Sequence, residues 1–206
     1  MSSVGWESPI ACAVRARRRI ANPQLTIANP ASRSVVVLGV GNRLRGDDAI
    51  GCLVCDELCK ERIPGIKDSR SSVPDTGILD SSTPRPLSDF VFVLDCGNTP
   101  ENYIQPVVDR SPERILVVDC CDYGAKPGEF RLFSRPEIEQ LSYGLLSTHT
   151  LPLTLTIEML SIATKARIEL LGIQPERIEF GTDLSPAAQS ALPALVERVR
   201  AWARES

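Results

Sequence analysis

Apolar runs alternate with amphipathic stretches along most of this chain. The apolar runs are short and nearly free of polar residues, as strands buried on both faces of a parallel sheet are; they cover 35–40, 90–95, 115–119 and 168–173. Between them, apolar residues recur every three or four positions, which predicts helices over about 47–62, over about 152–166, and after Ser185. We therefore predict an α/β fold: a three-layer αβα sandwich, with a mostly parallel twisted sheet of about five strands and helices on both faces.

Three segments have weaker patterns. Residues 129–133 alternate between apolar and polar, which predicts an edge strand, and 178–180 read as one more short strand. Residues 66–88 are rich in Ser, Pro and Asp and follow no period, which predicts a long surface-loop insertion.

The first 33 residues differ from the rest of the chain. They are basic and acid-poor and contain no sustained hydrophobic period. We interpret 1–33 as a disordered basic extension, or as the product of a start codon placed too early; a transit peptide is the alternative. The predicted folded domain is 34–206.

Composition excludes several classes of protein. The chain has 206 residues, 43% of them hydrophobic, and a formal net charge of −3, so nothing indicates a nucleic-acid-binding surface. No apolar stretch reaches the roughly 20 residues that span a bilayer. The seven cysteines are odd in number and do not resemble a disulfide framework, which favours reduced thiols in a cytoplasmic protein. Cys52, Cys55 and Cys59 have helical spacing suited to a metal cluster, but buried core positions are the favoured interpretation.

The first predicted strand leads into a glycine-rich turn, 39–46, and then a helix that begins with Asp47 and Asp48. A dinucleotide fingerprint requires glycine where this turn has Leu44. Helix N-termini usually attract anions, but two carboxylates at this one repel phosphate and favour a cation. We expect Asp47 to help the helix begin rather than to contact a metal.

Three residues are candidate ligands for that cation: Asp48, Asp119 at the end of a strand, and His149, the single histidine of the chain. In an open parallel sheet, ligands bind where the strands end. Two carboxylates and a neutral imidazole suit a divalent first-row ion such as nickel, zinc or manganese. A lone histidine is more often a surface or capping residue, so spacing alone supports only an α/β protein with a candidate cation site.

Several motifs together resemble those of the NiFe-hydrogenase maturation proteases. They are the glycine turn through Asp48, the strand end and turn at 95–102, the strand with its following turn at 114–129, and the segments 148–153 and 171–175. The last two resemble the branch that processes hydrogenase-3-type large subunits. The similarity runs from about Val35 to Trp202, and residues 1–33 and 66–88 are longer than the family pattern.

The resemblance implies an endopeptidase, classed as aspartic-type, that removes the C-terminal extension of a hydrogenase large-subunit precursor after nickel insertion. Nickel carried by the precursor is then the recognition feature, and no tightly held cofactor is expected. The family's metal-contact and catalytic positions correspond to Asp48, Asp119 and His149. We expect a cytoplasmic enzyme activator whose partner is the precursor. Asp95 is expected either to make a further polar contact or to cap the next helix.

Two other functions stay open on the sequence. One is a non-catalytic, nickel-dependent carrier or checkpoint that binds the precursor without cutting it. The other is a flavodoxin-like module that binds a small molecule.

Overall fold

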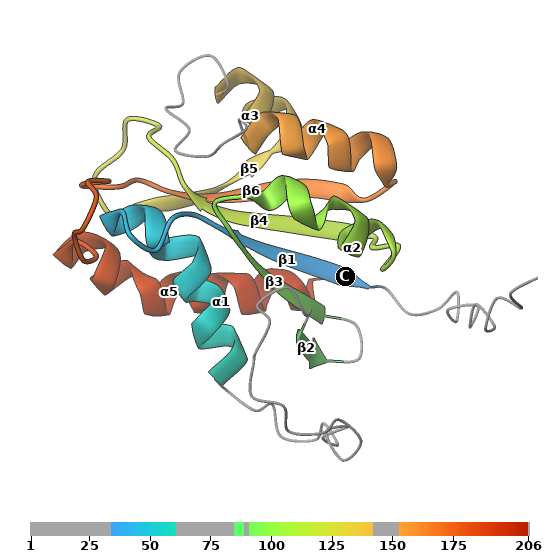
Figure 1. Cartoon of the computed structure of the whole chain (residues 1–206), viewed down its shortest axis with the longest axis horizontal. Helices are drawn as coiled ribbons and strands as arrows, with labels where there is room; N and C mark the ends of the chain where they lie inside the picture. Colours follow the sequence, from blue (N-terminus) through green and yellow to red (C-terminus); the bar gives the residue numbers. More distant parts are fainter. Residues whose placement is uncertain (1–33, 61–84, 89–90, 142–152, 206) are drawn as a thin grey trace, which may run out of the picture. The chain divides into compact units, whose positions relative to one another are not determined.

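The centre of the fold is a sheet with strand order β2-β3-β1-β4-β6-β5 (Figure 1). The computed structural model describes residues 34–60, 85–88, 91–141 and 153–205, and within them the sheet has six strands. The middle four are mutually parallel, whereas β2 and β5 are antiparallel to their neighbours at the two edges. The strands are β1 (Val35–Val40), β2 (Arg85–Ser88), β3 (Val91–Gly97), β4 (Arg114–Cys120), β5 (Phe130–Ser134) and β6 (Arg167–Ile173).

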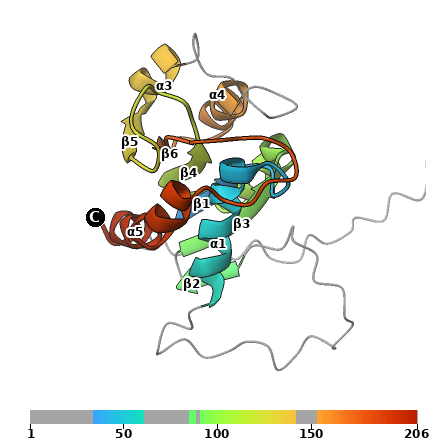
Figure 2. The same ribbon diagram turned by 90° about the vertical axis from the view of Figure 1, so that its left-hand side faces the viewer.

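Helices cover both faces of this sheet (Figures 1 and 2). On one face, α1 and α5 enclose a core that includes Val37, Leu116 and Trp202. On the other, α2, α3 and α4 cover a second core. The elements are η2 (Gly46–Ala49), α1 (Ile50–Lys60), η4 (Pro100–Tyr103), α2 (Ile104–Val108), α3 (Arg135–Leu141), α4 (Leu153–Ala163) and α5 (Pro186–Arg204). The predicted three-layer α/β sandwich is confirmed.

Most of the predicted elements are confirmed with shifted ends. The apolar runs form the four parallel strands, and the alternating segment forms the edge strand β5. The first helix begins later than predicted, because 46–49 is a 3-10 turn and the α-helix starts at Ile50. The last helix begins as predicted: the Ser185 hydroxyl accepts a hydrogen bond from Ala188 N at 3.1 Å.

Two expectations about strands are wrong. Residues 178–180 form no strand; the Ile178 carbonyl instead accepts a hydrogen bond from Arg45 Nε at 3.3 Å. β6 is paired with β4 on one side and with β5 on the other, where Phe130 pairs with Ile173. It therefore has no free hydrogen-bonding edge for residues 178–180. The other error is at 85–88, which was predicted to end a loop but forms β2. No apolar alternation marks this four-residue edge strand, so the sequence pattern did not distinguish it from the loop before it.

Close packing of α1 against two strands fixes the end of the sheet where the candidate site lies. A Cβ atom added to Gly51 would lie 2.2 Å from the Val40 carbonyl oxygen and 2.3 Å from that of Val118. Only glycine permits this approach, because real Cβ atoms do not come so close to backbone oxygens. The 3-10 turn before α1 is therefore held over the carboxyl ends of both β1 and β4.

A buried ion cluster joins α5 to the sheet. Glu169 on β6 is 3% exposed and accepts hydrogen bonds from Trp202 Nε1 at 2.9 Å and from an Arg167 guanidinium nitrogen at 2.8 Å. The Arg114 guanidinium carbon lies 4.0 Å from the centre of the Trp202 ring. Each partner therefore compensates part of the cost of burying the Glu169 carboxylate.

Replacing Trp202 by phenylalanine is expected to lower the free energy of unfolding by about 1.5–3 kcal/mol, the contribution of a hydrogen bond to a charged group. Phenylalanine keeps most of the ring but has no N–H for Glu169. The midpoint of urea unfolding measures the loss. Glu169→Gln is the companion variant. Its amide oxygen still accepts from Trp202 but carries no charge, so it separates the effect of the charge from that of the hydrogen bond. An unchanged midpoint for Trp202→Phe would contradict a stabilising role for this bond.

Candidate functional site

The turn after β1 holds the carboxylate of Asp48 in place. The backbone N–H of Asn42 donates to Asp48 Oδ2 at 3.1 Å. Gly41 permits this geometry: its φ is +141°, and a Cβ atom there would lie 1.7 Å from the Asp48 carbonyl oxygen. The Asn42 side chain accepts from Leu44 N at 3.0 Å and so helps to shape the turn. Asp48 is buried, with 1% of its surface exposed.

Asp119 lies near the carboxyl end of the neighbouring strand, β4, and Cys120 lies between the two carboxylates. Asp119 Oδ1 accepts from the Cys120 backbone N–H at 2.8 Å, and the Cys120 thiol donates to Asp48 Oδ1 at 3.7 Å. Asp119 is also buried, with 4% exposed. Two carboxylates thus lie beside the same residue at the carboxyl end of the sheet.

The Cys120 thiol is protonated in this setting. Burial, and to a smaller degree the charges of Asp119 and Asp48, raise its pKa well above the usual value. A protonated thiol is a weak hydrogen-bond donor, so Cys120 can hold a carboxylate but is no ready nucleophile. The structure therefore gives no support to cysteine-protease chemistry at this residue.

The third predicted member of the site, His149, lies outside the described residues, as do 1–33 and 66–84. Among the residues that are described, no group of three or more His, Cys, Asp or Glu side chains has the geometry to hold a metal ion. The described part of the site is thus a pair of acids, and the expectation that His149 joins them stays a prediction.

Asp47 has a different role from the one expected of it. Its carboxylate does not cap the helix but accepts hydrogen bonds from Glu176 N (2.8 Å), Arg177 N (3.2 Å), Ser185 N (2.7 Å) and Ser185 Oγ (2.8 Å). With 0% exposed, it ties the turn to the segment between β6 and α5, which passes along η2 in Figure 2. Sequence reasoning missed this because the partners are about 130 positions away.

Asp95 pairs with the turn rather than with the next helix. Its Oδ2 accepts from an Arg43 guanidinium nitrogen at 2.6 Å, and its Oδ1 accepts from Gly97 N at 3.1 Å. Arg43 also pairs with Asp56 at 2.7 Å. The hydrogen bonds to Asp56 and then Asp95 raise the pKa of Arg43, so it is charged at every relevant pH. Of the two roles considered for Asp95, the polar contact near the site is supported.

Gln174 is a structural residue that the sequence did not single out. Its side-chain oxygen accepts from Tyr123 N (2.9 Å) and Ala125 N (3.1 Å), and its nitrogen donates to Asp122 Oδ1 (3.0 Å). Gln174 is 7% exposed, so it fixes the loop that follows Asp119 from inside. The only sequence signal was a polar side chain directly after an apolar strand.

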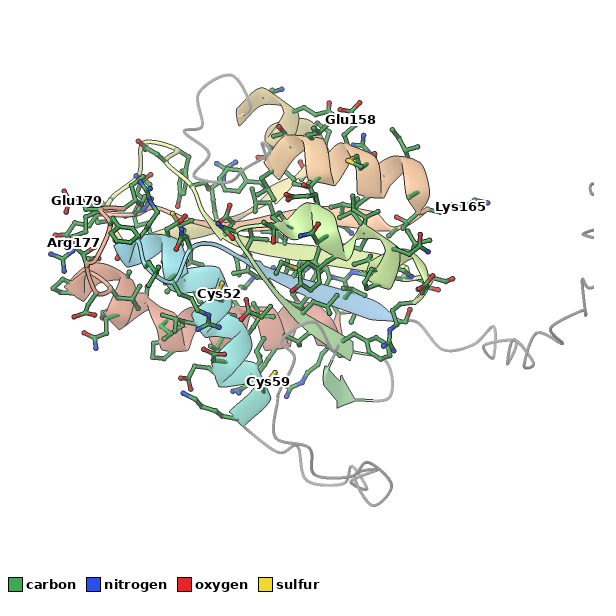
Figure 3. The ribbon with its side chains drawn as sticks, viewed as in Figure 1. Cys52, Cys59, Glu158, Lys165, Arg177 and Glu179 are labelled. Carbon is green, nitrogen blue, oxygen red and sulfur yellow. The ribbon has the colours of Figure 1, made fainter. Side chains whose placement is uncertain are left out.

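The cysteines of the described residues are core residues, as predicted. Cys52 and Cys55 are buried on α1, Cys59 packs against the same core, and no disulfide joins any of the six cysteines described. Figure 3 shows Cys52 and Cys59 along α1. Burial raises the pKa of Cys121 to about 12 and that of Cys52 further, so these thiols are neutral.

In the described part of the chain, no helix is long and apolar enough to cross a membrane.

Known proteins resemble this chain over most of its length. Residues 84–202, more than half of the chain, match the family described as hydrogenase maturation protease. The hydrogenase 3 maturation protease of Escherichia coli K12 is 28% identical over 167 residues, which are 81% of this chain and 89% of that protein. A putative hydrogenase maturation protease of Methanocaldococcus jannaschii is 29% identical over 148 residues, or 72% of this chain and 76% of that protein.

A similar fold has been solved. The crystal structure of a NiFe-hydrogenase maturation protease from Thermococcus kodakarensis KOD1 superimposes with a TM-score of 0.64 at 25% sequence identity. The match covers 85% of this chain and 96% of that one.

Proposed function

Because this chain belongs to the hydrogenase maturation protease family, we propose that it is an endopeptidase that removes the C-terminal extension of a nickel-loaded NiFe-hydrogenase large-subunit precursor. The observation that carries the proposal is the pair of buried acids, Asp48 and Asp119, on either side of Cys120 at the carboxyl end of the sheet. His149 completes the proposed site. Nickel is part of the substrate in this proposal, and the protein works in the cytoplasm.

Recognition and cleavage use the same three side chains. Asp48, Asp119 and His149 contact nickel that the precursor already holds, which brings the scissile peptide to the edge of the sheet. One carboxylate then accepts a proton from a water molecule as that water attacks the scissile carbonyl carbon. The C–N bond breaks as the amide nitrogen takes up a proton. Binding that depends on nickel delays cleavage until the metal has been inserted.

The hydrogen bonds described above support this role for the acids. Each oxygen of the Asp48 carboxylate has a donor, Asn42 N on one side and the Cys120 thiol on the other. The turn that carries Asp48 is itself held by the buried Asp47. A carboxylate fixed in this way needs little reorganisation when a cation or a proton arrives.

Mass spectrometry of the precursor tests the proposal. The full chain is mixed with nickel-loaded large-subunit precursor, and separately with the same precursor prepared without nickel. We expect the loaded precursor to lose the mass of its C-terminal extension and the nickel-free one to stay intact. If the loaded precursor binds but keeps its full mass, the protein is a carrier or checkpoint rather than a protease. If neither form binds or loses mass, the proposed substrate is wrong.

A further inference from the structure

Two large apolar side chains are exposed on adjoining loops at the candidate site. Leu44 is 59% exposed and Phe180 is 72% exposed. The loops are joined by a hydrogen bond from Gly181 N to the Leu44 carbonyl oxygen, at 2.7 Å. The other large hydrophobic residues that are exposed among the described residues all lie on α4: Leu155, Met159 and Ile162. The Leu44–Phe180 pair is thus separate from the exposed apolar face of that helix.

The pair is held on a rigid support rather than on loose loops. Gly46 N donates to the Thr182 carbonyl oxygen at 3.1 Å, and Asp47 N donates to that of Arg177 at 3.0 Å. Beneath them, the buried Asp47 carboxylate binds both ends of the 176–185 segment. Exposed apolar side chains on so well-bonded a backbone are preorganised for contact, because little conformational entropy is lost when a partner covers them.

The position of the pair connects it to the acids. Leu44 lies in the turn that ends at Asp48, and its N–H is bonded to Asn42, whose own N–H binds the Asp48 carboxylate. Figure 3 shows Arg177 and Glu179 at the end of the molecule where the parallel strands end, with Lys165 at the opposite end. A polypeptide that reaches Asp48 therefore arrives at the edge that bears Leu44 and Phe180.

We propose that Leu44 and Phe180 form a docking contact for an apolar segment of the precursor next to its scissile bond. This inference rests on the proposed function and extends it by naming the part of the protein that holds the substrate chain. Aromatic side chains are enriched in the cores of protein interfaces. Two side chains bury at most a few hundred Å², whereas a stable dimer needs about 800 Å² per partner. The patch is therefore too small to be a self-association face and fits one part of a larger substrate interface.

Paired double variants test the proposal. In Leu44→Ser/Phe180→Ser the exposed apolar pair at the site is removed. In Met159→Ser/Ile162→Ser another exposed apolar pair, 40% and 79% exposed, is removed from α4. The dissociation constant for nickel-loaded precursor and the cleavage parameters are measured for both variants and for the unaltered chain. We expect the first variant to raise the dissociation constant and KM by about 10- to 100-fold with kcat unchanged, because it removes apolar burial common to ground and transition states. The α4 variant is expected to match the unaltered chain.

A cross-linking measurement shows the contact directly. A photoreactive phenylalanine analogue placed at position 180 is expected to attach to the precursor, while the same analogue at position 162 is not. The attachment site, read by peptide mass spectrometry, is expected in an apolar segment near the cleaved bond. Unchanged affinity and KM in the first variant, or equal cross-linking from both positions, overturns the docking proposal.

The outcomes separate this inference from the proposed function. If the unaltered chain binds the precursor through this pair without cutting it, the docking contact stands and the protease activity is rejected. If the chain cuts the precursor and both double variants do so with the same KM, the activity stands and the docking contact is rejected. If the unaltered chain neither binds nor cuts nickel-loaded precursor, both are rejected.

Discussion

Replacing Asp48 by asparagine is expected to slow cleavage of the nickel-loaded precursor by about 10²- to 10⁴-fold, the usual contribution of a positioned acid or base. Asparagine has nearly the same shape, and its amide oxygen still accepts the bond that Asn42 N makes to the carboxylate at 3.1 Å. The negative charge that would bind a cation or accept a proton is lost. Cleavage rates from mass spectrometry, with circular dichroism to check folding, measure the effect. Asp119→Asn and His149→Ala are expected to have losses of the same order.

A matched control separates loss of function from a general effect of removing an acid. Asp109 is an exposed carboxylate that accepts a hydrogen bond from Gln105 at 2.7 Å, just beyond α2 and before β4 begins. Asp109→Asn is expected to cleave at the normal rate. Normal cleavage by a folded Asp48→Asn protein would reject the assigned site, and equal losses in both variants would show that the effect is not local to it.

The neighbouring acid is expected to give the largest loss of stability. Asp47→Ala removes four hydrogen bonds to a buried carboxylate and leaves backbone N–H groups of the 176–185 segment without their acceptor. Leaving a buried donor without its acceptor costs about 1–3 kcal/mol for each group. The Ser185 hydroxyl, which caps α5, loses its acceptor at the same time. The midpoint of urea unfolding is therefore expected to fall sharply.

Asparagine at position 47 does not restore the network. Both oxygens of the Asp47 carboxylate accept hydrogen bonds, whereas asparagine has only one acceptor oxygen. The NH₂ group of asparagine would take the place of the other oxygen and would face a backbone N–H, which is also a donor. The control is Asp183→Asn, the same chemical change at an exposed position of that segment, with an expected effect within about 0.5 kcal/mol. A normal midpoint for Asp47→Ala would show that the segment is held by its backbone bonds alone.

The sheet was predictable because burial on both faces leaves a local mark on the sequence. β1, β4 and β6 have almost no polar residues inside them, and a run of that kind suits the centre of a parallel sheet. The edge strand β2 leaves no such mark, because four residues paired on one side need no continuous apolar run. The predicted strand at 178–180 failed for the opposite reason: apolar residues were present, but β5 already occupied the edge beside β6.

Some features of the candidate site were likewise predictable from the sequence and others were not. The chain order of apolar strand, glycine turn and acid indicated Asp48 and Asp119 because carboxyl ends of parallel strands meet at one edge of a sheet. Other contacts at the site join segments that are distant in the chain. They are the bond from the Cys120 thiol to Asp48, the pairing of Arg43 with Asp95, and the Gln174 bonds to the loop after β4. No periodicity records contacts of this kind.

Asp47 and Asp48 show most clearly what sequence and structure each contributed. The sequence by itself determined an α/β sandwich and two adjacent acids after its first strand, since apolar periodicity and glycine turns act within a few residues. The sequence also assigned Asp48 rather than Asp47 to the site beside Asp119, but the partners of both carboxylates were decided by the tertiary structure alone. One carboxylate is enclosed by N–H groups of the 176–185 segment and the other lies against the end of β4, because hydrogen bonds select partners by distance in space and not along the chain.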